Sequence, residues 1–401
     1  MRIIQVTPYF HPHVGGVESH VFMLSKELMK RGHEVTIYST RFDKSLKKRD
    51  EYKGIKIRRV PQWANLFTTP ITPKMFEAIS EAKADIIHCH APPPLTAYYC
   101  AKAKKNLMAP LVMTYHCDLE LPFFGGGALI GLYRRTLGAY TLNRMDEIIV
   151  HTETYAATSR VLWNHHPTVI PTGVDLEKFH PDVDGSQIRE KICPEGQRLV
   201  MFVGRLMFHK GIEYFINASK YLEDTKFLIV GDGPYRKNLE VSKLNNPKGY
   251  NVVFAGNVPD DELPNYYAAC DVFVLPSVSR LEGFGLVMVE AMATGKPVVA
   301  SNMPGMREVM SDGEEGLLAE PLNALDFAHK ITILLDDGDL RRRLGENARR
   351  TAETRFSWAT IGTQVETLYN GMIAGKCKGR TRKVADAGRP VGTENEKKEE
   401  R

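Results

Sequence analysis

The regular alternation of short apolar runs with segments of helical periodicity is the feature that most constrains this chain. Between most apolar runs lies an amphipathic segment; in 17–31, for example, Val17, Val21, Leu24 and Leu28 fall at helical spacing. Strands that alternate with helices predict parallel sheets whose two faces are covered by helices. The expected strands form a first series at 2–7, 34–40, 55–60, 85–90, 110–116 and 147–152 and a second series at 198–203, 226–231, 251–256, 271–276, 297–301 and 316–319.

The two series, together with a length of 401 residues, predict two domains. The stretch IPTGVD at 170–175 separates the series, and its Pro and Gly indicate a hinge. We therefore expect two doubly wound α/β domains at 1–172 and 173–356, with a cleft between them, and a final helix at 357–373. The charged residues 374–401 lack the apolar side chains that an ordered segment needs, so we expect a disordered tail, with a weak electrostatic tether as the alternative.

Charge and hydropathy exclude several classes of protein. The net charge of +5 falls short of a nucleic-acid-binding surface but suits an anionic ligand. No run of about 18 apolar residues occurs, and the N-terminus has no signal-peptide pattern, so we expect a cytoplasmic protein without a membrane span. Six cysteines without a C-x-x-C pair indicate reduced thiols.

Glycines and cations gather where the predicted strands end, and open α/β sheets bind their ligands there. Gly204-Arg205 follows the strand at 198–203, and Lys210 opens the next helix; a planar Arg and a Lys point charge suit a diphosphate. Gly231 and Gly233 follow the next strand. Each glycine loop taken alone is more simply an ordinary tight turn.

Gly15 and Gly16 stand at the start of the first predicted helix, where bare backbone N–H groups favour an anion. The first domain has no G-x-G-x-x-G, and the chain has no G-x-x-x-x-G-K-[ST]. A dinucleotide-dependent dehydrogenase and a P-loop nucleotidase are therefore disfavoured. The convergence of glycine loops, cations and acids on one cleft still predicts a ligand that carries phosphate.

Two glutamates, Glu282 and Glu290, lie among apolar and small residues in the stretch LEGFGLVMVEAMATGKPVVAS at 281–301. Ionised carboxylates are rarely buried without partners. Hydroxyl groups of a ligand can satisfy them, because a carboxylate accepts two hydrogen bonds at once. In the structural alternative, Glu282 caps the helix that starts near Gly285, and Glu290 pairs with Lys296.

Six short motifs occur together and in order, and through them the chain resembles the retaining glycosyltransferases of family 4 over residues 1–373. The resemblance implies the GT-B fold, which has two Rossmann-like domains, an inter-domain cleft and a last helix that crosses back to the first domain. The motifs are G-G-V-E at 15–18, T-Y-H at 114–116, V-G-R-L at 203–206, K-G at 210–211, G-D-G-P at 231–234 and E-x7-E from Glu282 to Glu290.

The resemblance also implies roles at the matching positions. Arg205 and Lys210 would hold the donor diphosphate and stabilise the leaving group, and His116 would lie near the donor sugar. Glu290 would bind the ribose hydroxyls, and Glu282 the hydroxyls of the donor sugar. Further nucleotide-sugar contacts are implied for Gly15, Gly16, Gly204, Gly231, Gly233, Gly256, Asn257, Gly283, Phe284, Gly285 and Leu286, and acceptor-side positions for Glu18 and His90.

The implied reaction transfers a hexose of the mannose or glucose type from a UDP-, GDP- or ADP-sugar to an acceptor hydroxyl, with retention at the anomeric carbon. The acceptor is expected to be a glycolipid, a lipid phosphate or an oligosaccharide. No Asp-x-Asp motif stands at a strand end, so we expect no required metal or cofactor. A sugar-nucleotide epimerase of the same fold and a non-catalytic sugar-nucleotide-binding protein are the alternatives.

Two further features concern metals and partners. His88-Cys89-His90 and His116-Cys117-Asp118 contain metal-ligating residue types, but alternation along a strand places Cys89 opposite the two histidines, which disfavours zinc. The segment 121–140 combines aromatic residues and glycines with Arg134-Arg135. It predicts either an amphipathic helix or a contact between the first domain and the cytoplasmic face of a membrane.

Overall fold

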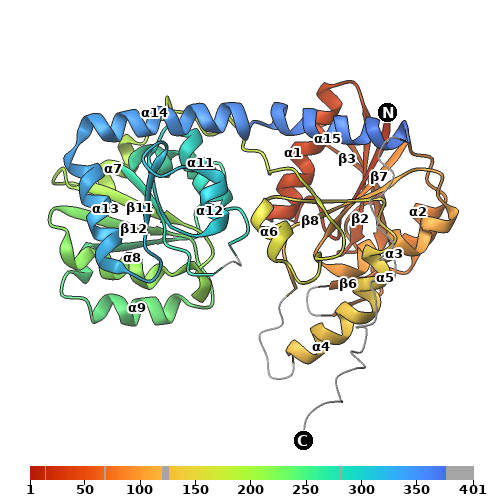
Figure 1. Ribbon diagram of the computed structural model, residues 1–401, viewed down its shortest axis with the longest axis horizontal. Helices are drawn as coiled ribbons and strands as arrows, with labels where there is room; N and C mark the ends of the chain where they lie inside the picture. Colours follow the sequence, from red (N-terminus) through yellow and green to blue (C-terminus); the bar gives the residue numbers. More distant parts are fainter. Residues whose placement is uncertain (14, 67–68, 120–125, 280–281, 376–401) are drawn as a thin grey trace, which may run out of the picture.

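The chain folds into two α/β lobes that lie side by side, one for each series of strands (Figure 1). Helices α14 (Gly338–Arg355) and α15 (Trp358–Ile373) run along one edge of both lobes. Both lobes are built on mainly parallel sheets, which confirms the expected doubly wound α/β architecture. The expected tail lies, from residue 376 on, outside the described residues. The computed structural model describes residues 1–13, 15–66, 69–119, 126–279 and 282–375.

The first lobe contains an eight-stranded sheet in the order β10-β9-β8-β7-β1-β2-β4-β3. β3 runs antiparallel to β4, and the other pairs are parallel. All six strands predicted for this lobe occur. The pattern does not predict β3, β10 or the hairpin β5–β6, because these strands have two to four residues and lie largely outside the core. The strands are β1 (Arg2–Val6), β2 (Glu34–Arg41), β3 (Arg49–Tyr52), β4 (Ile55–Pro61), β5 (Ala64–Leu66), β6 (Thr69–Ile71), β7 (Ile86–Ala91), β8 (Leu111–Tyr115), β9 (Glu147–Val150) and β10 (Thr168–Val169).

Helices cover both faces of this sheet. α1 buries Val21, Leu24 and Leu28 in the core, as their helical spacing predicts. Of the segment 121–140, residues 121–125 lie outside the described residues; the rest is helical, with α4 and α5 joined by the π-helical turn η2 (Arg134–Gly138). None of the helices in the described ranges is long and apolar enough to cross a membrane. The helices are α1 (Gly16–Lys30), α2 (Lys74–Ser80), α3 (Pro94–Ala103), α4 (Gly126–Tyr133), α5 (Ala139–Leu142) and α6 (Glu153–Thr158).

The second lobe contains a six-stranded parallel sheet in the order β13-β12-β11-β14-β15-β16. Every strand predicted here occurs within one or two residues of its expected bounds. The central strands are buried on both faces, as continuous apolar runs predict for a covered parallel sheet. The elements are β11 (Arg198–Val203), β12 (Thr225–Val230), β13 (Val252–Gly256), β14 (Val272–Leu275), β15 (Val298–Ser301), β16 (Gly316–Ala319), α7 (Ser186–Ile192), α8 (Ile212–Ala218), α9 (Arg236–Leu244), α10 (Leu263–Ala269), α11 (Leu286–Ala293), α12 (Pro304–Val309) and α13 (Ala324–Asp336).

The last helix, α15, belongs to the core of the first lobe. Ser357 caps it by accepting a hydrogen bond from the Thr360 N–H at 3.1 Å. Val365 and Tyr369 are buried in one hydrophobic cluster with residues of α1 and of the first sheet. The chain therefore crosses between the lobes twice, at 170–175 and at 355–358. The Val174 N–H donates to the Phe356 carbonyl at 2.8 Å, so the two crossings are hydrogen-bonded to each other.

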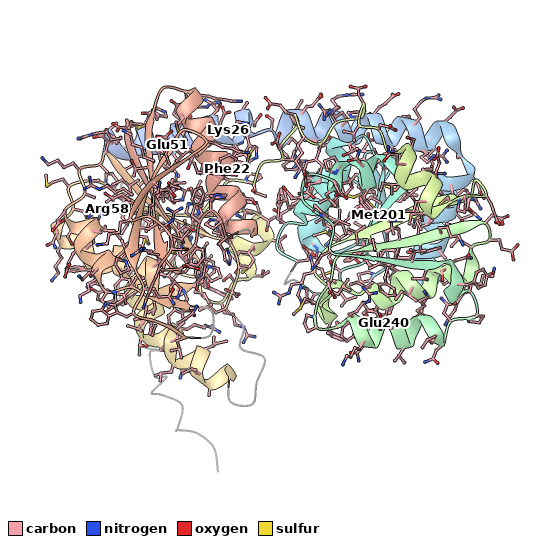
Figure 2. The ribbon with its side chains drawn as sticks, turned by 180° about the vertical axis from the view of Figure 1, so that it is seen from behind. Phe22, Lys26, Glu51, Arg58, Met201 and Glu240 are labelled. Carbon is pink, nitrogen blue, oxygen red and sulfur yellow. The ribbon has the colours of Figure 1, made fainter. Side chains whose placement is uncertain are left out.

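Further contacts join the lobes beside these crossings. The carboxylate of Glu308 on α12 accepts hydrogen bonds from the backbone N–H groups of Glu153 and Thr154 at the start of α6, at 2.5 and 2.6 Å. Helix N-termini favour such a carboxylate. A second contact comes from α1. The Lys26 ammonium (labelled in Figure 2) lies 3.8 Å from the Glu177 carboxylate of the second lobe. That pair is exposed and contributes little to stability.

Candidate active site

The loops that follow the central strands of both sheets meet between the lobes. The strand order reverses between β1 and β7 in the first sheet and between β11 and β14 in the second. Open α/β sheets bind ligands beyond the carboxyl ends of the strands at such reversals. Most of the predicted site residues follow these four strands and their neighbours, and parallel strands bring their carboxyl ends to one edge.

The glycine loops of the second domain pack against each other. Gly231 has φ +120°, and a Cβ added there would lie 2.1 Å from the carbonyl oxygen of Gly204. A Cβ at Gly233 would lie 2.4 Å from the Leu206 oxygen. These close approaches alone explain two of the glycines, without a ligand. Arg205 lies in the same loop, is exposed, and forms no side-chain hydrogen bond or ion pair with any described residue.

Lys210 and Glu282 form an ion pair at the reversal between β11 and β14. Their side chains are only 15% and 9% exposed. The Ser277 hydroxyl also donates to the Glu282 carboxylate, at 2.8 Å. A backbone hydrogen bond from Val278 to His209, 2.9 Å long, holds the two loops together. A basic and an acidic side chain 72 residues apart thus share one partly buried position.

Glu290 lies on α11, where its carboxylate accepts a hydrogen bond of 2.8 Å from the Tyr267 hydroxyl. Burial raises the pKa of Glu290 to about 7, although the hydrogen bond from Tyr267 opposes the rise. The expected alternative pairing does not occur. The Lys296 ammonium instead donates to the backbone carbonyl of Ala268, at 2.7 Å.

The start of α11 points toward the site without a side-chain cap. Gly285 precedes the helix in the left-handed region, at φ +71°, where glycine is favoured. Among the described residues, no side chain accepts a hydrogen bond from its first turn, and the Glu282 carboxylate is bound by Lys210 and Ser277, so Glu282 does not cap this helix in the way that the structural alternative requires. The first amides of a helix have no helical partners, and those that begin at Leu286 are suited to bind an anion.

The loop before α11 contacts the first domain. A Cβ added to Gly283 would lie 3.9 Å from the carbonyl oxygen of His116. The Phe284 ring is buried, with its centroid 6.2 Å from the ring of His151 and 5.5 Å from that of Phe356. His116 is therefore next to the second-domain loop that the sequence predicts to bind the donor sugar.

Four histidines of the first domain cluster at that contact. A ring nitrogen from each of His20, His90 and His116 lies within 4.8 Å of the others. His90 Nδ1 is 3.2 Å from His116 Nε2, and His116 Nδ1 is 3.1 Å from His151 Nε2. Burial lowers the pKa of His20, His90 and His116 well below the usual value and that of His151 to about 4. The rings are consequently neutral at physiological pH.

The histidine cluster is connected to α15 by hydrogen bonds. His90 Nε2 lies 2.8 Å from Gln5 Oε1, and Gln5 Nε2 donates to the Tyr369 hydroxyl at 3.5 Å. The same hydroxyl lies 2.6 Å from His88 Nδ1. His90 is fully buried, so it does not line the acceptor side as the sequence predicts. It contacts His116 instead, because its strand lies in the interior of the sheet.

Neutral imidazoles are the usual ligands of zinc and related metals, and His20, His90 and His116 could supply three of them. This set differs from the one considered in the sequence, since His20 comes from α1 and Cys89 points into the hydrophobic core on the opposite face. The absence of a required metal remains a prediction.

The remaining predicted positions lie around the same edge. Gly256 ends β13, and Asn257, which follows it, is exposed. Gly15 and Gly16 begin α1, where a Cβ added to Gly15 would lie 2.4 Å from the Glu18 carboxylate. Burial raises the pKa of Glu18. The ligand contacts expected of these residues remain predictions.

A polar pocket of about 270 Å³ was not predicted; Ser279 of the second domain lines it together with side chains of the first. Tyr115 and Ser159 each donate to Asp118 Oδ1 at 3.2 Å. Burial and the nearby Asp118 carboxylate raise the pKa of the Tyr115 hydroxyl. The sequence could have indicated this pocket, because Asp118 stands two residues after His116, where a predicted strand ends.

Comparisons with known proteins agree with this geometry. The family described as Glycosyltransferase Family 4 matches residues 14–178, and Glycosyl transferases group 1 matches residues 185–351. An uncharacterised glycosyltransferase of Methanocaldococcus jannaschii is 30% identical over 408 residues, which cover 95% of this chain and all of the relative. A GDP-mannose-dependent alpha-(1-6)-phosphatidylinositol monomannoside mannosyltransferase of Mycolicibacterium smegmatis is 28% identical over 92% of this chain and 98% of its own. An Anabaena protein solved with UDP-glucose superposes with a TM-score of 0.73 at 23% identity, over 92% of this chain and all of that one.

Proposed function

The chain belongs to the family 4 glycosyltransferases with the GT-B fold, and from this premise we propose that it transfers a hexose from a nucleoside-diphosphate sugar to an acceptor hydroxyl with retention. The hexose is of the mannose or glucose type, and the donor is a UDP-, GDP- or ADP-sugar. The mycobacterial relative that is named for GDP-mannose supports a nucleotide-sugar donor. The Anabaena structure with UDP-glucose supports it in the same way.

The observation that carries the proposal is the Lys210–Glu282 pair beside the exposed Arg205, at the strand reversal of the second domain. Breaking the anomeric C–O bond leaves negative charge on the departing diphosphate. Arg205, Lys210 and the first amides of α11 would stabilise that charge in a site whose donors are already positioned. Glu282 holds the ammonium of Lys210 in place and would accept hydrogen bonds from donor-sugar hydroxyls.

Glu290 would bind the other end of the donor. A ribose diol offers two donors to one carboxylate, and such charge-assisted hydrogen bonds offset the cost of burying it. The pKa of Glu290 near 7 has a consequence for this role. The carboxylate is fully ionised only above neutral pH, so donor affinity should increase with pH through the neutral range.

The acceptor hydroxyl would enter through the polar pocket at Asp118. This pocket lies in front of the loop that carries Glu282, because Ser279 forms part of its wall. The named acceptor of the mycobacterial relative is a phosphatidylinositol mannoside. We therefore propose a glycolipid or lipid-phosphate acceptor and a peripheral membrane contact through the first domain. Because Arg205 and Lys210 would balance the charge of the diphosphate, the proposed reaction needs no metal ion.

Two substitutions test the reaction. Arg205→Ala and Lys210→Ala should each lower the transfer rate about 100- to 1000-fold, measured with the donor that stabilises the wild-type protein most in a thermal-shift screen of UDP-, GDP- and ADP-sugars. Lys220→Ala, which removes an exposed lysine of the same domain, serves as the control. Near-wild-type rates in the first two variants would refute the scheme. A product with an epimerised sugar and no new glycosidic bond would favour the epimerase instead.

A further inference from the structure

An apolar groove of about 620 Å³ lies on the first domain, between the loop after β7 and the segment α4–η2. Figure 1 shows α4 projecting from the end of that lobe. Several large side chains in the groove are unusually exposed, with values of 54% for Leu66, 45% for Leu129, 60% for Leu132 and 39% for Leu137. Single exposed leucines are ordinary, but a contiguous set that lines one groove marks a binding surface.

The apolar groove continues into the polar pocket at Asp118. Asp118, Leu119, Ile130 and Tyr133 line both cavities. The Asp118 pocket brings hydroxyl groups and a guanidinium together with apolar side chains, whereas the groove is lined mainly by hydrocarbon. This division fits an amphiphile, whose head group would lie at the polar end and whose chain would lie along the leucines.

The polar end faces the reacting loop of the second domain. Ser279 lines that end, and Ser277, two residues earlier, donates to Glu282. Arg134 lines the same pocket, and a guanidinium there suits an anionic group close to the head. A bound amphiphile would thus present its head to the donor and its chain to the outside of the molecule.

We infer that this groove binds one hydrocarbon chain of a lipid-linked acceptor whose hydroxyl-bearing head group lies in the Asp118 pocket. The inference rests on the transferase function proposed above and specifies its acceptor subsite. A helix of a partner protein could also cover the leucines. It would not explain why the apolar groove and the Asp118 pocket share one wall.

Chain length is the variable that distinguishes this site. Each methylene group that enters an apolar site strengthens binding by about fourfold. A chain that lies in the groove must therefore improve binding stepwise, whereas a head group recognised alone binds equally well at any chain length. Octyl β-D-glucoside, with two more methylenes than hexyl β-D-glucoside, should bind about 15-fold more tightly.

The test measures binding of the two glucosides to the full-length protein by calorimetry, below their micelle concentrations. Leu129→Asn and Leu132→Asn should abolish the difference between the glucosides and leave nucleotide binding unchanged, because both side chains are exposed and line a groove formed by first-domain residues. Leu244→Asn, on α9 of the second domain and 82% exposed, is the matched control and should keep the difference.

Equal affinity of the wild-type protein for the two glucosides would overturn the inference, and so would an equal loss in Leu129→Asn, Leu132→Asn and Leu244→Asn. Transfer to an acceptor without any effect of chain length would overturn it too, while leaving the proposed function intact. If binding depends on chain length but the protein transfers no sugar, the proposed function is contradicted. The inference that the groove binds a hydrocarbon chain is then supported.

Discussion

At the scale of single residues, the two glutamates have different surroundings and therefore different chemistry. Glu282 is held by the ammonium of Lys210 and the hydroxyl of Ser277. Glu290 has the Tyr267 hydroxyl as its partner and a pKa near 7. Burial favours the protonated form of a carboxyl group and raises the pKa of Glu290, although the hydrogen bond from Tyr267 opposes the rise. The sequence spacing E-x7-E does not distinguish the two.

We predict that Tyr267→Phe shifts the pH dependence of donor binding. The lost hydrogen bond stabilises the Glu290 carboxylate, so the pKa of Glu290 should rise by roughly one unit. In the wild type, the donor dissociation constant should increase as pH falls through about 7. In the variant, the same increase should occur at higher pH. Titrations of nucleotide binding between pH 6 and 9 measure both.

Tyr266→Phe is the control for this prediction, because Tyr266 is the neighbour in α10 and forms no hydrogen bond with Glu290 in the described structure. Its profile should match the wild type. An unchanged profile in Tyr267→Phe would show that Glu290 does not bind the donor in its ionised form.

At the scale of elements, α15 is attached to the first domain by polar contacts as well as by its apolar face. Tyr369 bonds to His88 at 2.6 Å, and Glu366 accepts hydrogen bonds from Arg31 at 3.1 Å and lies 2.8 Å from His33 Nε2. Through Gln5 the same tyrosine is connected to His90 and, through His90, to His116. The helix that follows the second domain is thereby linked to the histidine cluster of the first.

We predict that Tyr369→Phe destabilises the first domain by about 1–3 kcal/mol, because it leaves a buried nitrogen of His88 without its partner. Urea unfolding followed by circular dichroism measures the change. Asn370→Ala, at the next and exposed position of α15, should have a free energy of unfolding within about 0.5 kcal/mol of the wild type. Equal stability of both variants would show that the hydrogen bond to His88 is dispensable.

At the scale of the whole molecule, the buried histidines make the fold sensitive to acid. Burial lowers the pKa of His88 to about 3, whereas an unfolded histidine titrates near 6.5. Between these values the unfolded chain binds more protons than the folded chain. The free energy of unfolding therefore rises with pH in this window, and stability is lost as pH falls below about 6.5.

We predict that His88 contributes a loss of about 1.4 kcal/mol per pH unit between pH 6 and pH 4, measured as the urea midpoint at several pH values. His88→Gln removes one titrating group, so it should reduce the slope by about 1.4 kcal/mol per pH unit. This holds whatever the effect of the substitution on stability at pH 7.5. His329→Gln, which removes an exposed histidine of α13, should leave the slope unchanged. A wild-type stability that is flat from pH 7.5 to pH 5 would contradict the prediction.

The sequence by itself determined the two-domain α/β architecture, because the periods of strands and helices are local properties of the chain. It also determined the family, through motifs such as V-G-R-L at 203–206 that lie at strand ends. The division of the chain between 172 and 173 remains a prediction. The short strands β3, β5, β6 and β10 carry too few apolar residues to produce a periodic signal.

Only the tertiary structure decided which side chains meet. The Lys210–Glu282 pair, the contact of His20 with His90 and His116, and the wall shared by the Asp118 pocket and the leucine groove join segments far apart in the chain. The physical reason is the parallel sheet. Adjacent parallel strands are separated by a whole crossover, so neighbours at their carboxyl ends are distant in sequence and leave no local pattern.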